Sequence, residues 1–157
     1  MRATAVIRTA SDMTVVRQLF EQYQAQLGVD LCFQGFTAEL DGLPGKYAEP
    51  RGRLLLAELD GAVAGCVALR PYDGTRGEMK RLYVKPEVRG HGIGRALVAR
   101  VIDEARAIGY SELVLDTLPT MTEAQALYEW FGFREDTVPR DHPVAGTRYL
   151  TKHLADD

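Results

Sequence analysis

A run of arginine and glycine residues stands where a strand-like pattern changes to a helical one. Residues 89–94 read Arg-Gly-His-Gly-Ile-Gly, and apolar residues at helical spacing follow directly. The start of a helix carries unpaired backbone N–H groups and the positive end of the dipole, and glycines let the oxygens of a ligand approach them without meeting a Cβ. The pattern therefore predicts a phosphate-binding loop. Its candidate residues are Arg89, Gly90, His91, Gly92, Ile93, Gly94 and Arg95.

The charge of the surrounding segment is consistent with an anion site. The chain of 157 residues has a formal net charge of −3. Residues 79–100 nevertheless contain six basic side chains and one acid, Glu87. A basic surplus confined to one segment favours a small anionic ligand. A nucleic-acid partner would need a broad basic face that releases counterions from the phosphates, so we do not expect one.

Spacing separates several readings of the glycine segment. No Lys-Ser or Lys-Thr pair follows the glycines, so the P-loop pattern is absent. Glycines at 90, 92 and 94 do not meet the G-x-G-x-x-G fingerprint, which argues against a dinucleotide-binding module. The remaining pattern is Arg89-x-x-Gly92-x-Gly94. An ordinary glycine turn that caps a helix is its structural alternative.

That pattern resembles the [QR]-x-x-G-x-[GA] pyrophosphate loop of the GNAT superfamily of acyl-CoA-dependent N-acyltransferases. The Val-Lys-Pro-Glu-x-Arg-Gly segment before it, and residues 126–133, which resemble the A-x-x-L-Y-x-x-x-G-F block of that family, support the likeness. The resemblance implies transfer of an acetyl group from acetyl-CoA, the cosubstrate, to a primary amine of a small molecule or peptide by direct attack. A non-catalytic acyl-CoA-binding sensor or structural protein is the alternative.

The resemblance also implies roles for individual residues. Tyr128 matches the general acid that protonates the leaving thiolate, and Glu78 lies where several relatives carry a glutamate base. A base or a desolvating site is needed because an amine with a pKa of about 10.4 is almost fully charged at pH 7. The structural alternatives are a core aromatic for Tyr128 and a solvated carboxylate paired with Lys80 for Glu78. The strand expected to expose backbone N–H groups to pantetheine and the thioester, through a bulge, contains Leu82, Tyr83 and Val84.

One position departs from the family pattern. The block often opens with Asn seven residues before the tyrosine, whereas this chain has Met121 there. Methionine cannot supply the polar contact that Asn makes to the cofactor arm. Either Thr120, Thr122 or a backbone group takes that role, or the contact is missing.

The order of the expected elements defines the fold class. Strand-like patterns predict strands at 4–8, 53–59, 62–69, 78–84, 111–118, 133–137 and 147–153. Helical spacing predicts a first helix with an N-cap at Ser11-Asp12 and an end at Gly28, and further helices at 37–43, 93–108 and 122–131. Asp60-Gly61 predicts a tight hairpin turn, and the strand reached through a helical crossover should be parallel to the one before it. The order βα(α)βββαβαββ predicts one α/β domain over residues 1–157. By resemblance it is a GNAT-like fold with a mostly antiparallel sheet of six or seven strands and helices on both faces.

The acceptor is the least specified part of the prediction. Residues 29–52 read either as a binding or lid segment or as a loop whose aromatics cover the core. We expect the acceptor to contact this segment and residues 134–146, with negative charge for an ammonium group from Asp30, Glu135, Asp136 and Asp141. The same acids fit a solvated surface equally well. A homodimer is possible by resemblance, although the sequence identifies no interface.

The remaining cysteines and histidines predict little chemistry. Cys66 lies in an apolar run and reads as a core residue, and Cys32 is undecided. His91 reads as a solvent-facing loop cap and His142 as part of a turn, and no ligand spacing predicts a metal site. No apolar run approaches the roughly 18 residues of a membrane span and no signal peptide is visible, so we expect a cytoplasmic protein without a membrane partner.

Overall fold

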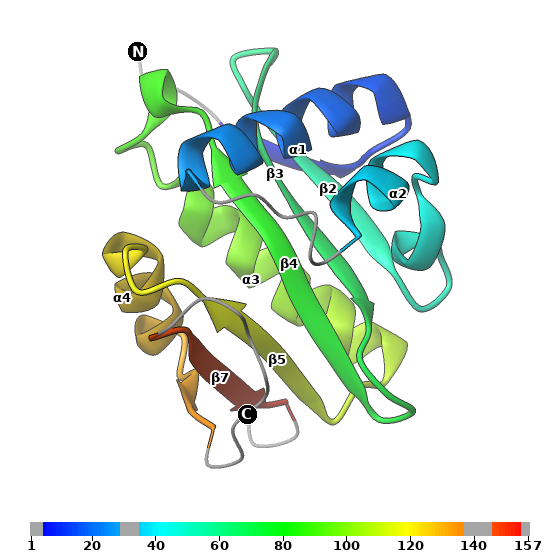
Figure 1. Ribbon diagram of the computed structural model, residues 1–157, viewed down its shortest axis with the longest axis vertical. Helices are drawn as coiled ribbons and strands as arrows, with labels where there is room; N and C mark the ends of the chain where they lie inside the picture. Colours follow the sequence, from blue (N-terminus) through cyan, green and yellow to red (C-terminus); the bar gives the residue numbers. More distant parts are fainter. Residues whose placement is uncertain (1–4, 29–34, 137–145, 155–157) are drawn as a thin grey trace.

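A seven-stranded mixed sheet forms the centre of the computed structural model, which describes residues 5–28, 35–136 and 146–154. The strand order is β1-β2-β3-β4-β5-β7-β6 (Figure 1). All neighbouring strands are antiparallel except β4 and β5, which are parallel, so the predicted mostly antiparallel sheet is confirmed. The strands are β1 (Ala5–Thr9), β2 (Arg53–Leu59), β3 (Ala62–Pro71), β4 (Arg76–Val84), β5 (Glu112–Thr117), β6 (Arg134–Glu135) and β7 (Arg148–His153).

Helices cover both faces of this sheet. In Figure 1, α1 and α2 lie in front of the strands and α3 crosses behind them. Asp12 caps α1 by accepting a hydrogen bond from the backbone N–H of Thr14 at 2.9 Å, and Gly28 ends it in the left-handed conformation, as its sequence predicts. The helices are α1 (Met13–Leu27), α2 (Phe36–Asp41), α3 (Ile93–Ile108) and α4 (Thr122–Trp130), with 3-10 turns η2 (Gly45–Tyr47) and η3 (Pro86–Val88).

Two hydrophobic cores lie on opposite faces of the sheet. In β2, Leu55 and Ala57 pack in the core that includes α3 and α4, whereas Leu54 and Leu56 pack in the core that includes α1 and α2. Burial on both faces explains why β2 and β3 read as nearly continuous apolar runs. Cys66 is buried in the α1 core and burial raises the pKa of its thiol to about 12, which confirms that it is a packing residue.

The predicted turns and crossover are present. Asp60 and Gly61 have φ values of 52° and 85°, and two positive φ values are what a primed hairpin turn between β2 and β3 requires. The α3 crossover delivers β5 parallel to β4, as expected. The predicted strand at 133–137 is shorter in the structure, because β6 contains only Arg134 and Glu135 within the described residues.

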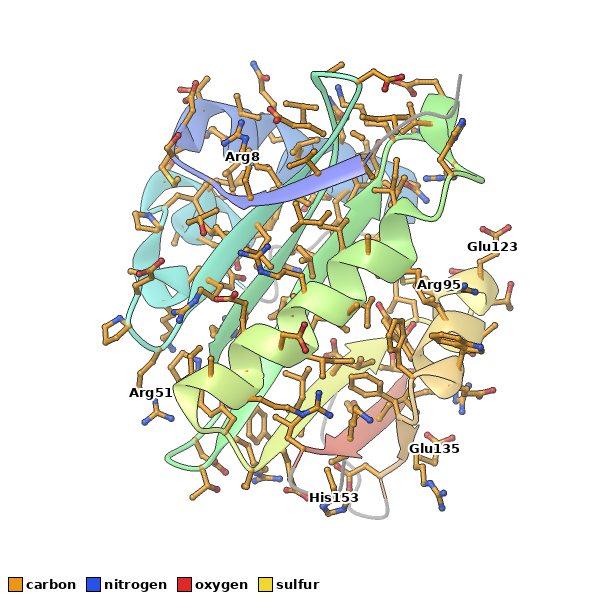
Figure 2. All side chains as sticks on the ribbon, turned by 180° about the vertical axis from the view of Figure 1, so that it is seen from behind. Arg8, Arg51, Arg95, Glu123, Glu135 and His153 are labelled. Atoms are coloured by element: carbon orange, nitrogen blue, oxygen red, sulfur yellow. The ribbon has the colours of Figure 1, made fainter. Side chains whose placement is uncertain are left out.

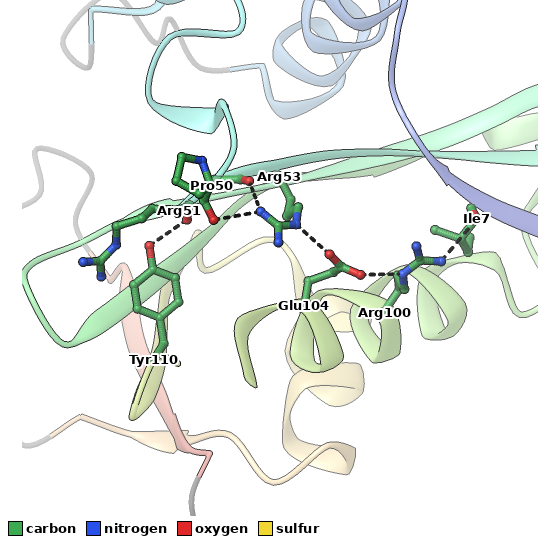
Figure 3. Close-up of polar contacts among 8 residues, drawn as sticks. Ile7, Pro50, Arg51, Arg53, Arg100, Glu104 and Tyr110 are labelled. Atoms are coloured by element: carbon green, nitrogen blue, oxygen red, sulfur yellow. Dashed lines mark hydrogen bonds and ion pairs between the residues drawn. The ribbon is translucent and has the colours of Figure 1, made fainter. Parts of the chain in front are cut away.

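A chain of charged contacts holds α3 against the edge of the sheet (Figure 3). The two carboxylate oxygens of Glu104 accept hydrogen bonds from Arg53 of β2 at 2.6 Å and from Arg100 at 2.9 Å. Arg100 also donates to the carbonyl oxygen of Ile7 in β1 at 3.3 Å. Since the glycine segment leads directly into α3, these contacts help to position it.

Candidate functional site

The two parallel strands separate after a short region of pairing. β4 pairs with β5 only from Arg76 to Glu78, opposite residues 112–114. Beyond that point β4 continues to Val84 and β5 to Thr117 without a register between them, and the strands diverge in Figure 1. The sheet is therefore open between residues 79–84 of β4 and 115–117 of β5, although each strand remains paired with its other neighbour.

A β-bulge in β4 accompanies this opening. Val67 of β3 lies opposite two residues of β4, Arg81 and Leu82. Arg81 has a φ of 61°, which is uncommon for a residue with a side chain. The neighbouring strand accommodates the bulge through Gly65, where a Cβ would lie 2.3 Å from the carbonyl oxygen of Tyr83. The bulge expected from the family resemblance is thus present, immediately before residues 82–84.

The glycine segment forms the start of α3. Gly92 is the N-cap with a φ of 76°, and Gly90 has a φ of 90°. No side chain caps this helix, so the N–H groups of its first turn have no partner of that kind. These groups and the helix dipole favour an anion at this end of α3.

A cleft of about 670 Å³ joins the glycine segment to the open part of the sheet. Its walls come from α1, the end of β4, the start of α3 and the start of α4. The side chain of His91 does not line this cleft, because it is exposed and its Nδ1 lies 2.9 Å from the carbonyl oxygen of Val88. The predicted ligand-binding residues that do line it are Leu82, Tyr83, Val84, Arg89, Gly90, Gly92, Ile93, Gly94 and Arg95.

Two arginines border the cleft in defined positions. Arg89 donates hydrogen bonds to the carbonyl oxygen of Val84 at 3.1 Å and to Gln26 of α1 at 2.6 Å. Arg95 lies with its guanidinium 4.4 Å from the centre of the exposed Trp130 ring, and Figure 2 shows it beside α4. Both arginines line the cleft, which therefore suits an anionic ligand.

An inner cavity of about 30 Å³ continues from the cleft into the opening between β4 and β5. Four residues line both spaces, namely Tyr23, Leu27, Leu82 and Met121. The inner cavity is also bordered by polar groups of β4, β5 and α4: Lys80, Arg81, Asp116, Thr117 and Tyr128. A ligand in the cleft can thus present one end to a small, largely polar chamber.

The sequence matches the model of the acetyltransferase (GNAT) family over residues 16–133. This chain belongs to the GNAT family. An uncharacterized N-acetyltransferase of Schizosaccharomyces pombe is 37% identical over 153 residues, covering 96% of this chain and 94% of that protein. A GNAT-family acetyltransferase from Staphylococcus aureus has the same fold, with a TM-score of 0.79, 21% identity and coverage of 96% of this chain and 99% of that one.

A second GNAT-like structure comes from Salmonella typhimurium, where a protein classed as an acetyltransferase was solved with its cofactor acetyl-CoA. It has a TM-score of 0.68 and 23% identity, and the match covers 98% of this chain and 95% of that one. The predicted fold class and family are therefore confirmed. Within the described residues, no cluster of His, Cys, Asp and Glu could hold a metal ion, and no helix is long and apolar enough to cross a membrane.

Tyr128 of this GNAT protein, the predicted acid, lies in the wall of the inner cavity. It is buried, lines the inner cavity and packs its ring against Phe133 at 5.8 Å between ring centres. Burial raises the pKa of its hydroxyl, and Tyr23 and Asp116 act in the same direction. The hydroxyl is therefore protonated at neutral pH, as a proton donor must be.

Glu78 occupies a more constrained position than the sequence predicts. Its side chain is 9% exposed, so it is not a solvated carboxylate, although the pairing with Lys80 that this alternative expected is present. It accepts a hydrogen bond from Arg70 at 2.9 Å and lies 4.0 Å from the ammonium of Lys80. It lines neither the cleft nor the inner cavity, so contact with a substrate would have to run through water.

The acids expected to attract the acceptor do not gather at the cavity. Glu135 accepts a hydrogen bond from Arg148 at 3.1 Å, and Asp136 accepts one from Thr151 at 3.1 Å. Neither lines the cleft or the inner cavity. Asp30 and Asp141, together with Cys32 and His142, lie outside the described residues.

Several cavity residues were not singled out from the sequence. Tyr23 and Leu27 lie at the helical spacing of a packed face, so their pattern alone predicts core positions. Asp116 offered a signal, since it is an acid that directly follows the apolar residues 113–115 of a predicted strand. Thr120, Met121 and Thr122 all line the cleft, so both threonines that could replace the family asparagine lie beside it.

Proposed function

We propose that this GNAT protein transfers an acetyl group from acetyl-CoA to a primary amine of a small molecule or peptide, with both substrates bound at once. The observation that carries the proposal is the cleft that runs from the start of α3 to the inner cavity between β4 and β5, with which it shares four lining residues. A nucleotide diphosphate at the α3 end of the cleft and a thioester at the mouth of the inner cavity match this arrangement. Family membership supports the same chemistry.

Acetyl-CoA would be held by backbone groups more than by side chains. The N–H groups from Arg89 to Gly94 would bind the pyrophosphate, with the charges of Arg89 and Arg95 beside it. The pantetheine arm would follow residues 82–84 into the opening. There a backbone N–H next to the bulge would donate to the carbonyl oxygen as it becomes negative.

The transfer proceeds by direct attack on the thioester. The acceptor amine first loses its extra proton, for which Glu78 acting through water is the candidate base. The neutral nitrogen then bonds to the carbonyl carbon, the carbon–sulfur bond breaks, and the electron pair leaves on the thiolate of CoA. Tyr128 donates a proton to that thiolate and regains one from the nitrogen of the new amide. The products are an N-acetyl amide, free CoA and one proton released to solvent.

A thiol-release assay tests this function. The protein is incubated with acetyl-CoA and a panel of small amines, amino acids and peptides, and free CoA and the acetylated product are measured together. We expect equal amounts of thiol and amide with at least one class of amine. Tight binding of acetyl-CoA without thiol release across the panel would favour a non-catalytic acyl-CoA sensor instead.

A further inference from the structure

The bulge in β4 places two consecutive cations on the same face of the sheet. In a regular strand, neighbouring side chains point to opposite faces. Lys80 pairs with Ala68, a residue of the α1 core, and Arg81 also faces α1 and α2, because its guanidinium lies 5.7 Å from the ring of Tyr23 and 5.2 Å from that of Phe36. Without the bulge, Arg81 would point toward α3. Both cations instead border the inner cavity.

The charge of Arg81 is already balanced. Its Nε and one terminal nitrogen donate to the two carboxylate oxygens of Glu39 in α2, each at 3.0 Å. Burial alone would lower the pKa of Arg81, but the hydrogen bonds that it donates to Glu39 raise it. Arg81 therefore serves mainly to attach α2 to the sheet.

Lys80 is buried without comparable compensation. Its side chain is 6% exposed, and the nearest carboxylate is that of Glu78, with 4.0 Å between charged atoms. That carboxylate already accepts a hydrogen bond from Arg70 at 2.9 Å. The 4.0 Å separation from Glu78 is longer than a hydrogen bond, so this carboxylate does not satisfy the three donors of the Lys80 ammonium. A buried ammonium in this state favours an anionic ligand.

A second polar group faces the same space. The hydroxyl oxygen of Thr117 is buried and has no hydrogen-bond partner within the described residues, and Thr117 lines the inner cavity with Lys80. A volume of about 30 Å³ holds roughly two water-sized atoms, which is the size of the two oxygens of a carboxylate. The inner cavity thus offers a cation, a hydroxyl and room for a group of that size.

We propose that the acceptor amine carries a carboxylate, as amino acids do, and that Lys80 binds this carboxylate in the inner cavity with a second hydrogen bond from Thr117. This inference rests on the proposed acetyl transfer. The amine of the acceptor would then lie near Leu82 and Met121, which line both the cavity and the cleft, and so next to the thioester. Asp116 borders the same cavity and gives it the negative charge that attracts an ammonium.

The electrostatic surroundings of Lys80 agree with a carboxylate ligand. Burial lowers the pKa of Lys80, whereas Glu78 and Asp116 raise it and Arg81 and Arg70 lower it further. A bound carboxylate would act in the same direction as the two acids. It would also keep the ammonium charged while water is excluded.

Matched acceptors test the inference on the unaltered protein. Each amino acid of the panel is compared with its own carboxamide, which keeps the amine and the side chain but removes the negative charge. We expect kcat/KM to be about 10- to 100-fold higher for the acids, the range of a hydrogen bond to a charged group. Carboxamides that react as fast as the acids would overturn the inference and leave the proposed acetyl transfer intact.

Two lysine variants test whether Lys80 is the residue that recognises the carboxylate of the acceptor. Lys80→Met keeps the length of the side chain and removes the charge, and Lys152→Met makes the same change at a partly exposed lysine of β7 that lines neither cavity. Lys80→Met should raise KM for the acids by about 10- to 100-fold and leave kcat/KM for the carboxamides within about 3-fold. Lys152→Met should leave both unchanged.

Other outcomes distinguish a failure of carboxylate recognition by Lys80 from a failure of the proposed acetyl transfer. A Lys80→Met protein that keeps its unfolding midpoint but loses acids and carboxamides equally would mean that Lys80 does not read the carboxylate. If Lys80→Met does not fold, the comparison of acids with carboxamides on the unaltered protein decides alone. Absence of thiol release with every acceptor would overturn the proposed function, and the inference with it.

Discussion

Tyr128 packs its ring against Phe133 and lines the inner cavity, so the packing role of its ring and the proposed acid role of its hydroxyl can be tested separately. Tyr128→Phe keeps the ring and its contact with Phe133 but removes the proton donor. We expect kcat to fall by about 100-fold or more, in the range typical of general acid catalysis, with an unchanged unfolding midpoint. Steady-state kinetics and a thermal scan measure both.

Tyr110→Phe provides the matched control. Its hydroxyl donates to the carbonyl oxygen of Arg51 at 2.7 Å, and Tyr110 lines neither the cleft nor the inner cavity. This variant should lose about 1 kcal/mol of stability and keep its kcat. If Tyr128→Phe turned over at the wild-type rate, the thiolate would take its proton from another donor.

Glu78 is a weaker candidate than Tyr128 because Arg70 already binds its carboxylate. A base must accept a proton, which a glutamine side chain cannot do. In Glu78→Gln we expect a loss of about 100-fold in kcat/KM near neutral pH, measured by steady-state kinetics.

Glu58→Gln is the comparison for Glu78→Gln. Glu58 is paired with Arg8 at 3.0 Å, at a site that lines neither cavity. Glu58→Gln should leave kcat/KM unchanged. A wild-type kcat/KM in Glu78→Gln would assign Glu78 to the structural network with Arg70 and Lys80.

At the scale of elements, the start of α3 is the feature on which ligand binding depends. Gly92→Asp adds a negative charge to the site predicted for the pyrophosphate and places a side chain at a φ of 76°. Gly61→Asp introduces the same side chain at a φ of 85° in the β2–β3 hairpin, with open space around it at both positions. Both variants should lose about 1–3 kcal/mol of stability to backbone strain.

Only Gly92→Asp should weaken acetyl-CoA binding, with a rise in Kd of at least about 100-fold, because the added carboxylate repels the phosphates. Titration calorimetry on the two folded variants measures this difference. Equal affinities for acetyl-CoA would show that the glycine segment does not hold the pyrophosphate.

The contacts of Glu104 with β2 and within α3 should contribute to stability in a pH-dependent way (Figure 3). Hydrogen bonds from Arg100 and then Arg53 lower the pKa of Glu104 in the folded state. A lowered pKa stabilises the fold above the unfolded value of about 4.3, and this contribution is lost as pH falls through the folded value.

Glu104→Gln should therefore cost about 1–2 kcal/mol at pH 7, and the difference from wild type should shrink below about pH 4. Urea unfolding at several pH values measures the free energy of unfolding for both proteins. A difference that stays constant from pH 7 to pH 3 would mean that the charge of Glu104 does not contribute.

At the scale of the whole molecule, the parts predicted from sequence are those encoded by local patterns. The Asp60-Gly61 turn, the Asp12 cap and the α3 periodicity each depend on a few neighbouring residues, and each was predicted correctly. The bulge at Arg81 depends on packing between β3 and β4. It was expected only through the family resemblance, because no local signal in residues 79–84 encodes it.

The distribution of charge shows the same limit. The basic surplus of residues 79–100 was assigned as a whole to the anion site, yet Arg81 pairs with Glu39 and Arg100 with Glu104. Lys80 lines the inner cavity and does not line the cleft beside the glycine segment. Such assignments need three-dimensional contacts, since Glu39 lies 42 residues before Arg81 in the chain.

Acetyl-CoA binding is the property on which every assignment to the cleft depends. A thermal unfolding scan with acetyl-CoA, NAD and ATP in parallel measures it directly. At 100 times its dissociation constant, a ligand stabilises a protein by about 2.7 kcal/mol, which at this size raises the midpoint by roughly 5–10 °C. We predict this rise with acetyl-CoA alone. No rise with saturating acetyl-CoA, or an equal rise with NAD or ATP, would contradict the proposed acetyl transfer and the roles of Tyr128, Glu78 and Lys80.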